Sequence, residues 1–416
     1  MNFPEFLSET SLGRLSQWSE LSRGTLRVSG LGISAVALMV ADRFLKHPRT
    51  TLVLVRDYRE GELWMENLGN IAGEDSVRFF PSPGLKPYER KLPFDGVMEE
   101  RLRFFKEVGG SQPFIVVCPL DSFLMRLPSP GSLLRRMHTF KVGDIAEPSS
   151  LRQIFMDMGF REEPVVDGVG EFSIRGCIVD VNAYLYPHPI RLEFFGDELE
   201  SIRSFDIFSQ RSIDKMDFVE IFPHGEFTPT DRDREKFPGE EPGALWWRRS
   251  SLEKLDSSLL DYLPDADVAF ENMAVLGDLS DKLMASYVEA YPAAQELSPG
   301  LPEPSAIWFR FSDLTKDFAG RCALDWTRVV MENAGYEHFE SRPQSAAVTG
   351  TDKVAKEIED FAEQGGHVYL VSPTEGGAHR LKQLFEGVPV EDFLVGNLTE
   401  GFFLDDEGVA FLTETG

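Results

Sequence analysis

Two short apolar runs in the first third of the chain limit the folds open to it. They read TTLVLV at 50–55 and PFIVVC at 113–118, and a continuous run of this kind is typical of a strand buried on both faces of a parallel sheet. Segments of helical composition lie between them, at 57–69 and 94–110, and we expect the first helix to end at Gly69. Roughly the first 120 residues therefore predict a mostly parallel α/β domain.

A different pattern begins near residue 140. SSLRQIFMDMGF at 149–160 has the apolar periodicity of a helix. The segments after it, 170–181 and 189–208, alternate apolar with polar residues, and a Gly-Asp pair at 196–197 is typical of a tight hairpin turn. We expect a small α+β module over about residues 140–220.

Beyond this module the composition changes several times. Residues 223–245 are rich in Pro, Gly and acidic residues and predict a loop, whereas 341–354 has the composition of a linker. Residues 365–387 predict a strand, a turn and a helix, and GVAFLTETG at 408–416 predicts a strand with nothing after it to close a domain. We therefore expect a natural chain that continues beyond this sequence.

Charge and cysteine content argue against several classes of function. The chain has 42 Lys and Arg against 69 Asp and Glu, a net charge of −27, so its average surface repels a nucleic-acid backbone. Cys118, Cys177 and Cys322 are far apart and lack metal-ligand spacing, which argues against disulfides or zinc and favours a reducing cytoplasm. No long apolar run suggests a signal peptide or a membrane span. We expect a cytoplasmic protein that binds no metal or other cofactor.

GLGISAV at 30–36 stands where a strand would turn into a helix, the position of a phosphate-binding loop. In a working loop, G-x-x-x-x-G-K-[ST], the lysine neutralises phosphate charge and the hydroxyl binds magnesium. Aligning Gly32 with the second glycine puts Ile33 at the lysine position and Ser34 at the hydroxyl position. Arg27 then replaces the first glycine. We interpret this segment as a vestigial phosphate loop, formed by Gly30, Gly32, Ile33 and Ser34.

A structural turn is the simplest role for this loop. Residual anion binding at the helix N-terminus and ATP hydrolysis are the alternatives. The chain has no second loop of this kind, no G-x-S-x-G and no H-E-x-x-H. We therefore expect no catalytic residue.

The strand-like segment 190–195 presents a mixed face. Because side chains alternate along a strand, one face of this segment carries Ile190, Leu192 and Phe194. The opposite face carries Arg191, Glu193 and Phe195. In the segment just upstream, the same period points Phe172 and Ile174 inward and Ser173 and Arg175 outward. Arginine beside an exposed aromatic is typical of a binding hot spot. The alternative is structural: Phe195 packs under a loop and the arginines pair with Glu193 or Glu198.

Three motifs in this region carry a family resemblance. In order, they are R-G-x-x-x-D-V, R-x-E-F-F-G-D-E and F-D-x-x-S-Q-R-S, within residues 170–227. This block resembles the region shared by the excision-repair protein UvrB and the N-terminal part of the bacterial transcription-repair coupling factors (Mfd). Arg175, Gly176 and Asp180 match the first motif, although Asn182 and Ala183 stand where a proline is expected. Without the phosphate-loop lysine and a tyrosine-rich hairpin, the chain is more similar to the coupling factors than to UvrB.

The resemblance implies a multidomain α/β protein. Its first part is a degenerate phosphate-loop (UvrB- or helicase-like) α/β domain with a small α+β domain inserted, and a small α/β domain follows. The implied divisions are domain 1a at 1–138, domain 2 at 139–223, domain 1b at 224–345 and a truncated domain 3 at 346–416.

The resemblance also implies the partners. Domain 2 of the family recruits UvrA to lesions at stalled RNA polymerase and is masked by a C-terminal domain in the resting protein. The UvrA-contact positions correspond to Arg175, Arg191 and Phe195. RNA polymerase and DNA are bound mainly by parts absent here, and the whole protein is an ATP-dependent DNA translocase. We expect this part to be a monomeric, non-enzymatic adaptor that does not contact membranes.

Two alternatives remain open from the sequence. One is a divergent, UvrB-like, ATP-dependent DNA-repair helicase that uses the first domain. The other is a module whose domains 1a and 1b mainly restrain the motor of a longer protein.

Overall fold

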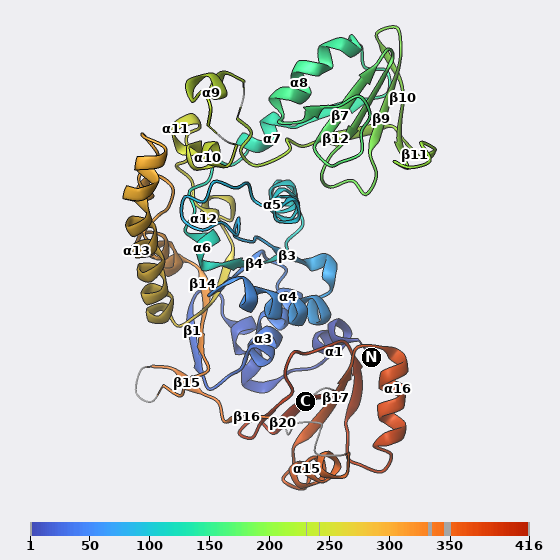
Figure 1. The fold of residues 1–416 in the computed structure, drawn as a ribbon. Helices are drawn as coiled ribbons and strands as arrows, with labels where there is room; N and C mark the ends of the chain where they lie inside the picture. Colours follow the sequence, from blue (N-terminus) through green and yellow to red (C-terminus); the bar gives the residue numbers. More distant parts are fainter. Residues whose placement is uncertain (1, 230, 241, 332–334, 345–350, 415–416) are drawn as a thin grey trace.

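The computed structural model describes residues 2–229, 231–240, 242–331, 335–344 and 351–414, and Figure 1 shows their arrangement. Within these residues the strands form sheets of seven, six, two and five strands. The seven-stranded sheet lies at the centre, the six-stranded sheet at one end and the five-stranded sheet at the other. The expected multidomain α/β fold is confirmed. The expected boundary between 345 and 346 falls outside the described residues.

The central sheet is parallel throughout, in the order β15-β1-β14-β13-β2-β4-β3. Leu52 and Leu54 pack into the core on one face of the sheet, and Val53 and Val55 into the core on the other. The prediction from the two apolar runs is therefore confirmed. The strands are β1 (Gly24–Ser29), β2 (Thr51–Val55), β3 (Val77–Phe79), β4 (Ile115–Pro119), β13 (Asp267–Glu271), β14 (Cys322–Thr327) and β15 (Glu337–His338).

Helices cover both faces of this sheet, with α3 and α4 in one core and α5 and α13 in the other. The helix expected to end at Gly69 continues to Ala72, because Ile71 still packs into the core and Gly73, at φ +93°, provides the left-handed exit. The helices before the six-stranded sheet are α1 (Phe3–Glu9), α2 (Gln17–Glu20), α3 (Ile33–Lys46), α4 (Tyr58–Ala72), α5 (Asp95–Val108), α6 (Leu120–Phe123) and α7 (Ser132–Arg136).

The loop expected over 223–245 is wrong in part. Two short helices form there, and the second buries Trp246 and Trp247 in the core beside α5 and α13. Burial of these tryptophans outweighs the poor helix propensity of the Pro- and Gly-rich sequence. The helices of this part are α9 (Asp231–Lys236), α10 (Pro242–Trp247), α11 (Arg249–Leu252), α12 (Leu259–Tyr262), α13 (Met273–Leu297) and α14 (Phe311–Leu314).

The six-stranded sheet has the order β11-β10-β9-β8-β7-β6. One face packs against α8 (Leu151–Asp157) and the antiparallel pair β5 (His138–Lys141) and β12 (Phe218–Ile221). The Gly-Asp pair at 196–197 joins β9 to β10 as expected. The strands are β6 (Arg161–Glu162), β7 (Glu171–Arg175), β8 (Ile178–Asn182), β9 (Ile190–Phe195), β10 (Glu198–Phe205) and β11 (Ser212–Met216).

The C-terminal sheet is mixed, in the order β16-β19-β20-β17-β18. It packs on the N-terminus of the chain, where Phe3 stacks on Phe411. The strand-turn-helix unit and the terminal strand predicted from the sequence are confirmed. The elements are α15 (Thr351–Glu363), α16 (Glu375–Leu384), β16 (Ser341–Pro343), β17 (His367–Ser372), β18 (Asp392–Val395), β19 (Phe402–Leu404) and β20 (Val409–Thr413). None of the described helices is long and apolar enough to span a membrane.

Candidate binding face and vestigial phosphate loop

The outer face of the six-stranded sheet is the side that faces away from α8, β5 and β12. On β9, the residues expected to face inward are buried in the core, whereas Arg191 and Glu193 are half-buried and Phe195 is exposed. The alternation predicted from the sequence is therefore confirmed for this strand.

A buried carboxylate lies at the middle of the outer face and binds two arginines. Asp180 on β8 stands opposite Arg191 on β9, and its side chain is almost fully buried. Arg191 Nε donates to Asp180 Oδ1 at 2.7 Å and Arg191 Nη2 donates to Oδ2 at 2.9 Å. Arg175 Nη2 donates to the same Oδ2 at 2.6 Å. Because one carboxylate receives both guanidinium groups, the two arginines are held in a fixed relation to each other.

Arg191 is the more constrained of the two arginines. Its guanidinium lies 4.3 Å from the centre of the Phe205 ring, and its Nη2 also donates to Gln210 Oε1 at 2.8 Å. The hydrogen bonds to Asp180 raise the pKa of Arg191 above its usual value, against the opposing effect of burial. Among the described residues, Nη1 of Arg191 has no partner. This arginine mainly holds its neighbours in place.

Arg175 and Phe195 are more available to a partner. The Arg175 side chain is 41% exposed, and among the described residues its Nε and Nη1 have no partner. Phe195 is 79% exposed and lies opposite Glu198, which in turn bridges to the exposed Ile145. The turns that follow Arg175 and Phe195 lie at the same end of the antiparallel sheet. Charge-assisted donors and an apolar ring are thus presented together.

Ser173 faces outward as expected, because it lies opposite Asp180 across β7 and β8, but the chain at Pro164 covers it and its Oγ donates to the Pro164 carbonyl at 3.0 Å. The structural alternative expected from the sequence is wrong in its ion pairs. The ion pairs of Arg175 and Arg191 are made with Asp180 rather than with Glu193 or Glu198. Glu193 Oε2 instead lies 3.0 Å from Arg203 Nη2.

The vestigial phosphate loop has the expected backbone. β1 ends at Ser29, Gly30 has φ +86°, and α3 begins directly after Gly32. Ile33, at the lysine position, is buried in the core beneath the sheet. Its aliphatic side chain supplies no cation where the lysine of a working loop would meet phosphate.

Residues from the C-terminal part of the chain fill this loop. Ser34 Oγ donates to Asn67 Oδ1 at 3.0 Å and accepts from the backbone N–H of Glu400 at 3.1 Å. Asn67 Nδ2 donates to Thr399 Oγ1 at 2.7 Å. A Cβ atom added to Gly32 would clash with the Glu400 carboxylate. A carboxylate of the chain itself therefore lies where a phosphate would approach the glycine.

The carboxyl ends of the neighbouring strands are also occupied by internal ion pairs. Arg56, after β2, forms a bidentate pair with Glu271 at the end of β13, and this hydrogen bonding raises the pKa of Arg56. Arg328, just beyond β14, lies 3.5 Å from Glu400. In open α/β sheets this edge is the usual place for ligands. The described residues contain no cluster of side chains suited to a metal ion.

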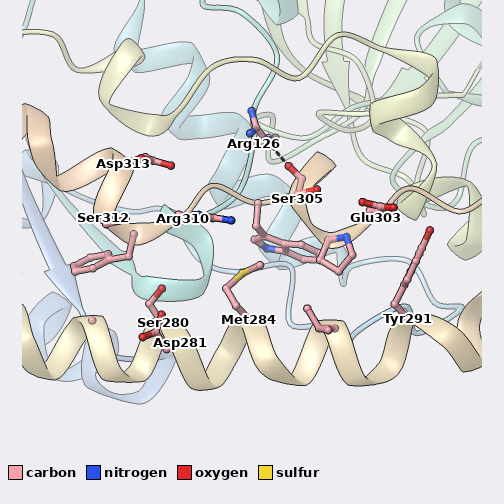
Figure 2. A pocket seen from close by; sticks show the side chains of 15 residues that line it. Arg126, Ser280, Asp281, Met284, Tyr291, Glu303, Ser305, Arg310, Ser312 and Asp313 are labelled. Atoms are coloured by element: carbon pink, nitrogen blue, oxygen red, sulfur yellow. Dashed lines mark hydrogen bonds between the residues drawn. The ribbon is translucent and has the colours of Figure 1, made fainter.

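A separate groove of about 870 Å³ runs between α13 and residues 303–313 (Figure 2). Arg126 lies above it, with its Nε donating to the Ser305 carbonyl at 3.0 Å and its guanidinium stacked on Phe309 at 3.9 Å. None of the residues selected from the sequence lines this groove. Its apolar lining is formed chiefly by Met284, Val288, Tyr291, Trp308 and Phe311.

Comparisons with known proteins agree with the motifs. Residues 139–227 match the family model described as the UvrB interaction domain. A transcription-repair-coupling factor of Staphylococcus aureus (strain bovine RF122 / ET3-1) is 21% identical over an alignment covering 93% of this chain and 38% of the relative. That of Myxococcus xanthus is 36% identical over 37% of this chain and 13% of the relative. That of Staphylococcus epidermidis (strain ATCC 12228 / FDA PCI 1200) is 28% identical over 55% of this chain and 19% of the relative.

The resemblance to the transcription-repair-coupling factors, first drawn from three motifs, is confirmed over nearly the whole chain. In these alignments the chain spans at most 38% of the length of the relatives.

Proposed function

We propose that this chain is an adaptor of transcription-coupled nucleotide excision repair, which recruits UvrA to lesions at stalled RNA polymerase. The observation that carries the proposal is the match of residues 139–227 to the UvrB interaction domain. The docking surface is the outer face of the six-stranded sheet, within the domain proposed at 139–223. The similarity to transcription-repair-coupling factors supports the pathway.

The proposed mechanism is recognition without chemistry. Phe195 loses most of its contact with water when the partner covers it, and apolar burial of this kind dominates binding hot spots. Arg175 donates its free N–H groups to acceptors on UvrA, and these charge-assisted bonds fix the orientation. Arg191 offers Nη1 to the partner while its other donors hold Asp180 and Gln210.

We also propose that this chain does not hydrolyse ATP. Ile33 at the lysine position and the Glu400 carboxylate beside Gly32 support this assignment. ATP-dependent translocation, and most contacts with DNA and RNA polymerase, are assigned to regions of the whole protein outside this chain. The UvrB-like helicase is not favoured, because its chemistry needs the cation that the loop lacks.

A pull-down with purified UvrA tests the proposal. Wild type retains UvrA, whereas Phe195→Ala and Arg175→Ala retain much less. Phe218→Ala is the matched control: Phe218 is exposed on β12, whose Val219 and Ile221 point into the core, so Phe218 faces away from the outer face. Equal retention by wild type and both outer-face variants would contradict the docking assignment.

A further inference from the structure

The turn between β10 and β11 carries a phenylalanine that the packing of the domain does not explain. Phe208 is 95% exposed, more than Phe195. A ring left in water contributes nothing to the core and favours aggregation. A partner that covers the Phe208 ring on binding would account for its exposure in the free chain.

The turn that presents Phe208 is held by its own hydrogen bonds. Asp206 Oδ1 accepts from the backbone N–H and from Oγ of Ser209, both at 2.7 Å. The backbone N–H of Asp206 donates to the Arg211 carbonyl at 2.9 Å, and that of Gln210 donates to the Asp206 carbonyl at 2.8 Å. Because the backbone is already ordered, less conformational entropy is lost when a partner binds the ring.

The same turn is tied to the outer face through Arg191. Gln210 Oε1 accepts from Arg191 Nη2 at 2.8 Å, and Gln210 Nε2 donates to the Ile207 carbonyl at 2.8 Å. Phe205, which leads into the turn, lies under the Arg191 guanidinium. Gln210 itself has φ +56°, a conformation that only a well-supported turn maintains in a residue other than glycine.

Phe195 and Phe208 lie at opposite ends of the sheet. The β9–β10 turn follows Phe195, and the β10–β11 turn contains Phe208, so the length of one antiparallel strand separates them. The strand that joins the two turns is β10, and its eight residues span about 24 Å. A partner that buries the usual area of about 800 Å² per side is wide enough to cover both ends.

We propose that Phe208 is a second anchor for UvrA, and that Arg191 and Gln210 are positioning residues that hold its turn against the outer face. The inference rests on the proposed function and extends the docking surface from one end of the sheet to the other. It also gives Arg191 a role through the turn, in addition to any contact of its own.

Titration calorimetry of the 416-residue chain with UvrA tests the inference. Phe208→Ala weakens binding about tenfold, while Phe218→Ala leaves it unchanged. Gln210→Asn keeps a residue that tolerates the left-handed backbone but shortens the amide, so it weakens binding to a smaller extent. Gln210→Glu keeps an acceptor for Arg191, so this variant retains most of the wild-type affinity for UvrA.

Non-additivity distinguishes positioning from independent contact. Because Gln210 acts through the turn, Phe208→Ala with Gln210→Asn binds no more weakly than Phe208→Ala alone. Full affinity of Phe208→Ala together with a loss in Phe195→Ala would overturn the second anchor and leave the proposed function standing. Full affinity of both variants would overturn both.

Discussion

The vestigial phosphate loop and the outer face of the six-stranded sheet differ in how their side chains are satisfied. At the loop, other parts of the same chain contact the glycine and hydroxyl positions: Glu400 lies against Gly32, and Ser34 bonds with Asn67 and Glu400. On the outer face and in the β10–β11 turn beside it, Phe195 and Phe208 remain exposed, and donors of Arg175 have no partner among the described residues. Side chains that are bonded to other parts of the same chain are not available to a ligand. Side chains that are held in place but left uncovered remain available to a partner protein.

Buried polar groups also have different roles in the two regions. Asp180 stabilises the outer face, the proposed docking surface, by fixing two arginines from below. Ser34 stabilises a contact between distant parts of the same chain. Variants at these two positions should therefore affect binding and stability in different proportions.

Asp180→Ala should have the largest effect on stability. It leaves Arg191, which is only 14% exposed, without its carboxylate, and breaking a largely buried pair costs about 3 kcal/mol. We expect a lower urea midpoint and weaker UvrA binding. Arg175→Ala is the control. Loss of the more exposed Arg175–Asp180 pair lowers the free energy of unfolding by about 1 kcal/mol or less, whereas UvrA binding is still lost. Unchanged stability of Asp180→Ala would show that the carboxylate does not organise the face.

Ser34→Ala should have an intermediate effect on stability and none on UvrA binding. It removes one of the two donors to the Asn67 amide oxygen, which keeps the Thr399 N–H, and the acceptor of the part-buried Glu400 N–H, at a cost of about 1–2 kcal/mol. Ser29→Ala is a matched control, because the buried Ser29 hydroxyl has no hydrogen-bond partner in the described part of the chain and its removal should be nearly neutral. The urea midpoints of both variants measure the difference. If UvrA binding fell with Ser34→Ala, the two regions would be coupled.

His224 should give the smallest effect, visible only in acid. Burial lowers the pKa of His224, whose ring stacks on Tyr184 at 4.9 Å. Because the unfolded state takes up the proton first, stability is complete above a pH of about 6.5 and falls as the pH drops toward the folded-state pKa, by up to about 1.4 kcal/mol per pH unit. His224→Phe should lose less stability than wild type between pH 7.5 and 5.5. Parallel loss in both proteins would contradict this assignment.

Local patterns predicted much of the fold. The strands β2, β4 and β9 and the turn at 196–197 follow from residue periodicity and turn chemistry alone. The helix α10 could not be predicted in this way, because its stability comes from burial of tryptophans against distant elements.

The two sites were predictable to different extents. The outward direction of Arg191 and Phe195 follows from a period of two. The partner of Arg191 does not, because the register that sets Asp180 opposite it depends on strand pairing. Glu400 lies 368 residues from Gly32 along the chain (400 − 32), so no local pattern connects it with the loop. The exposure of Phe208 likewise appears only when the turn is seen in place.

The most direct test of the docking assignment is hydrogen–deuterium exchange of this chain with and without UvrA. We expect slower exchange in the β9–β10 turn at 196–197 and in residues 206–211, with no change in residues 30–36 of the vestigial phosphate loop. Unchanged exchange in both turns, or protection confined to the loop, would contradict the claim that the outer face is the recognition surface.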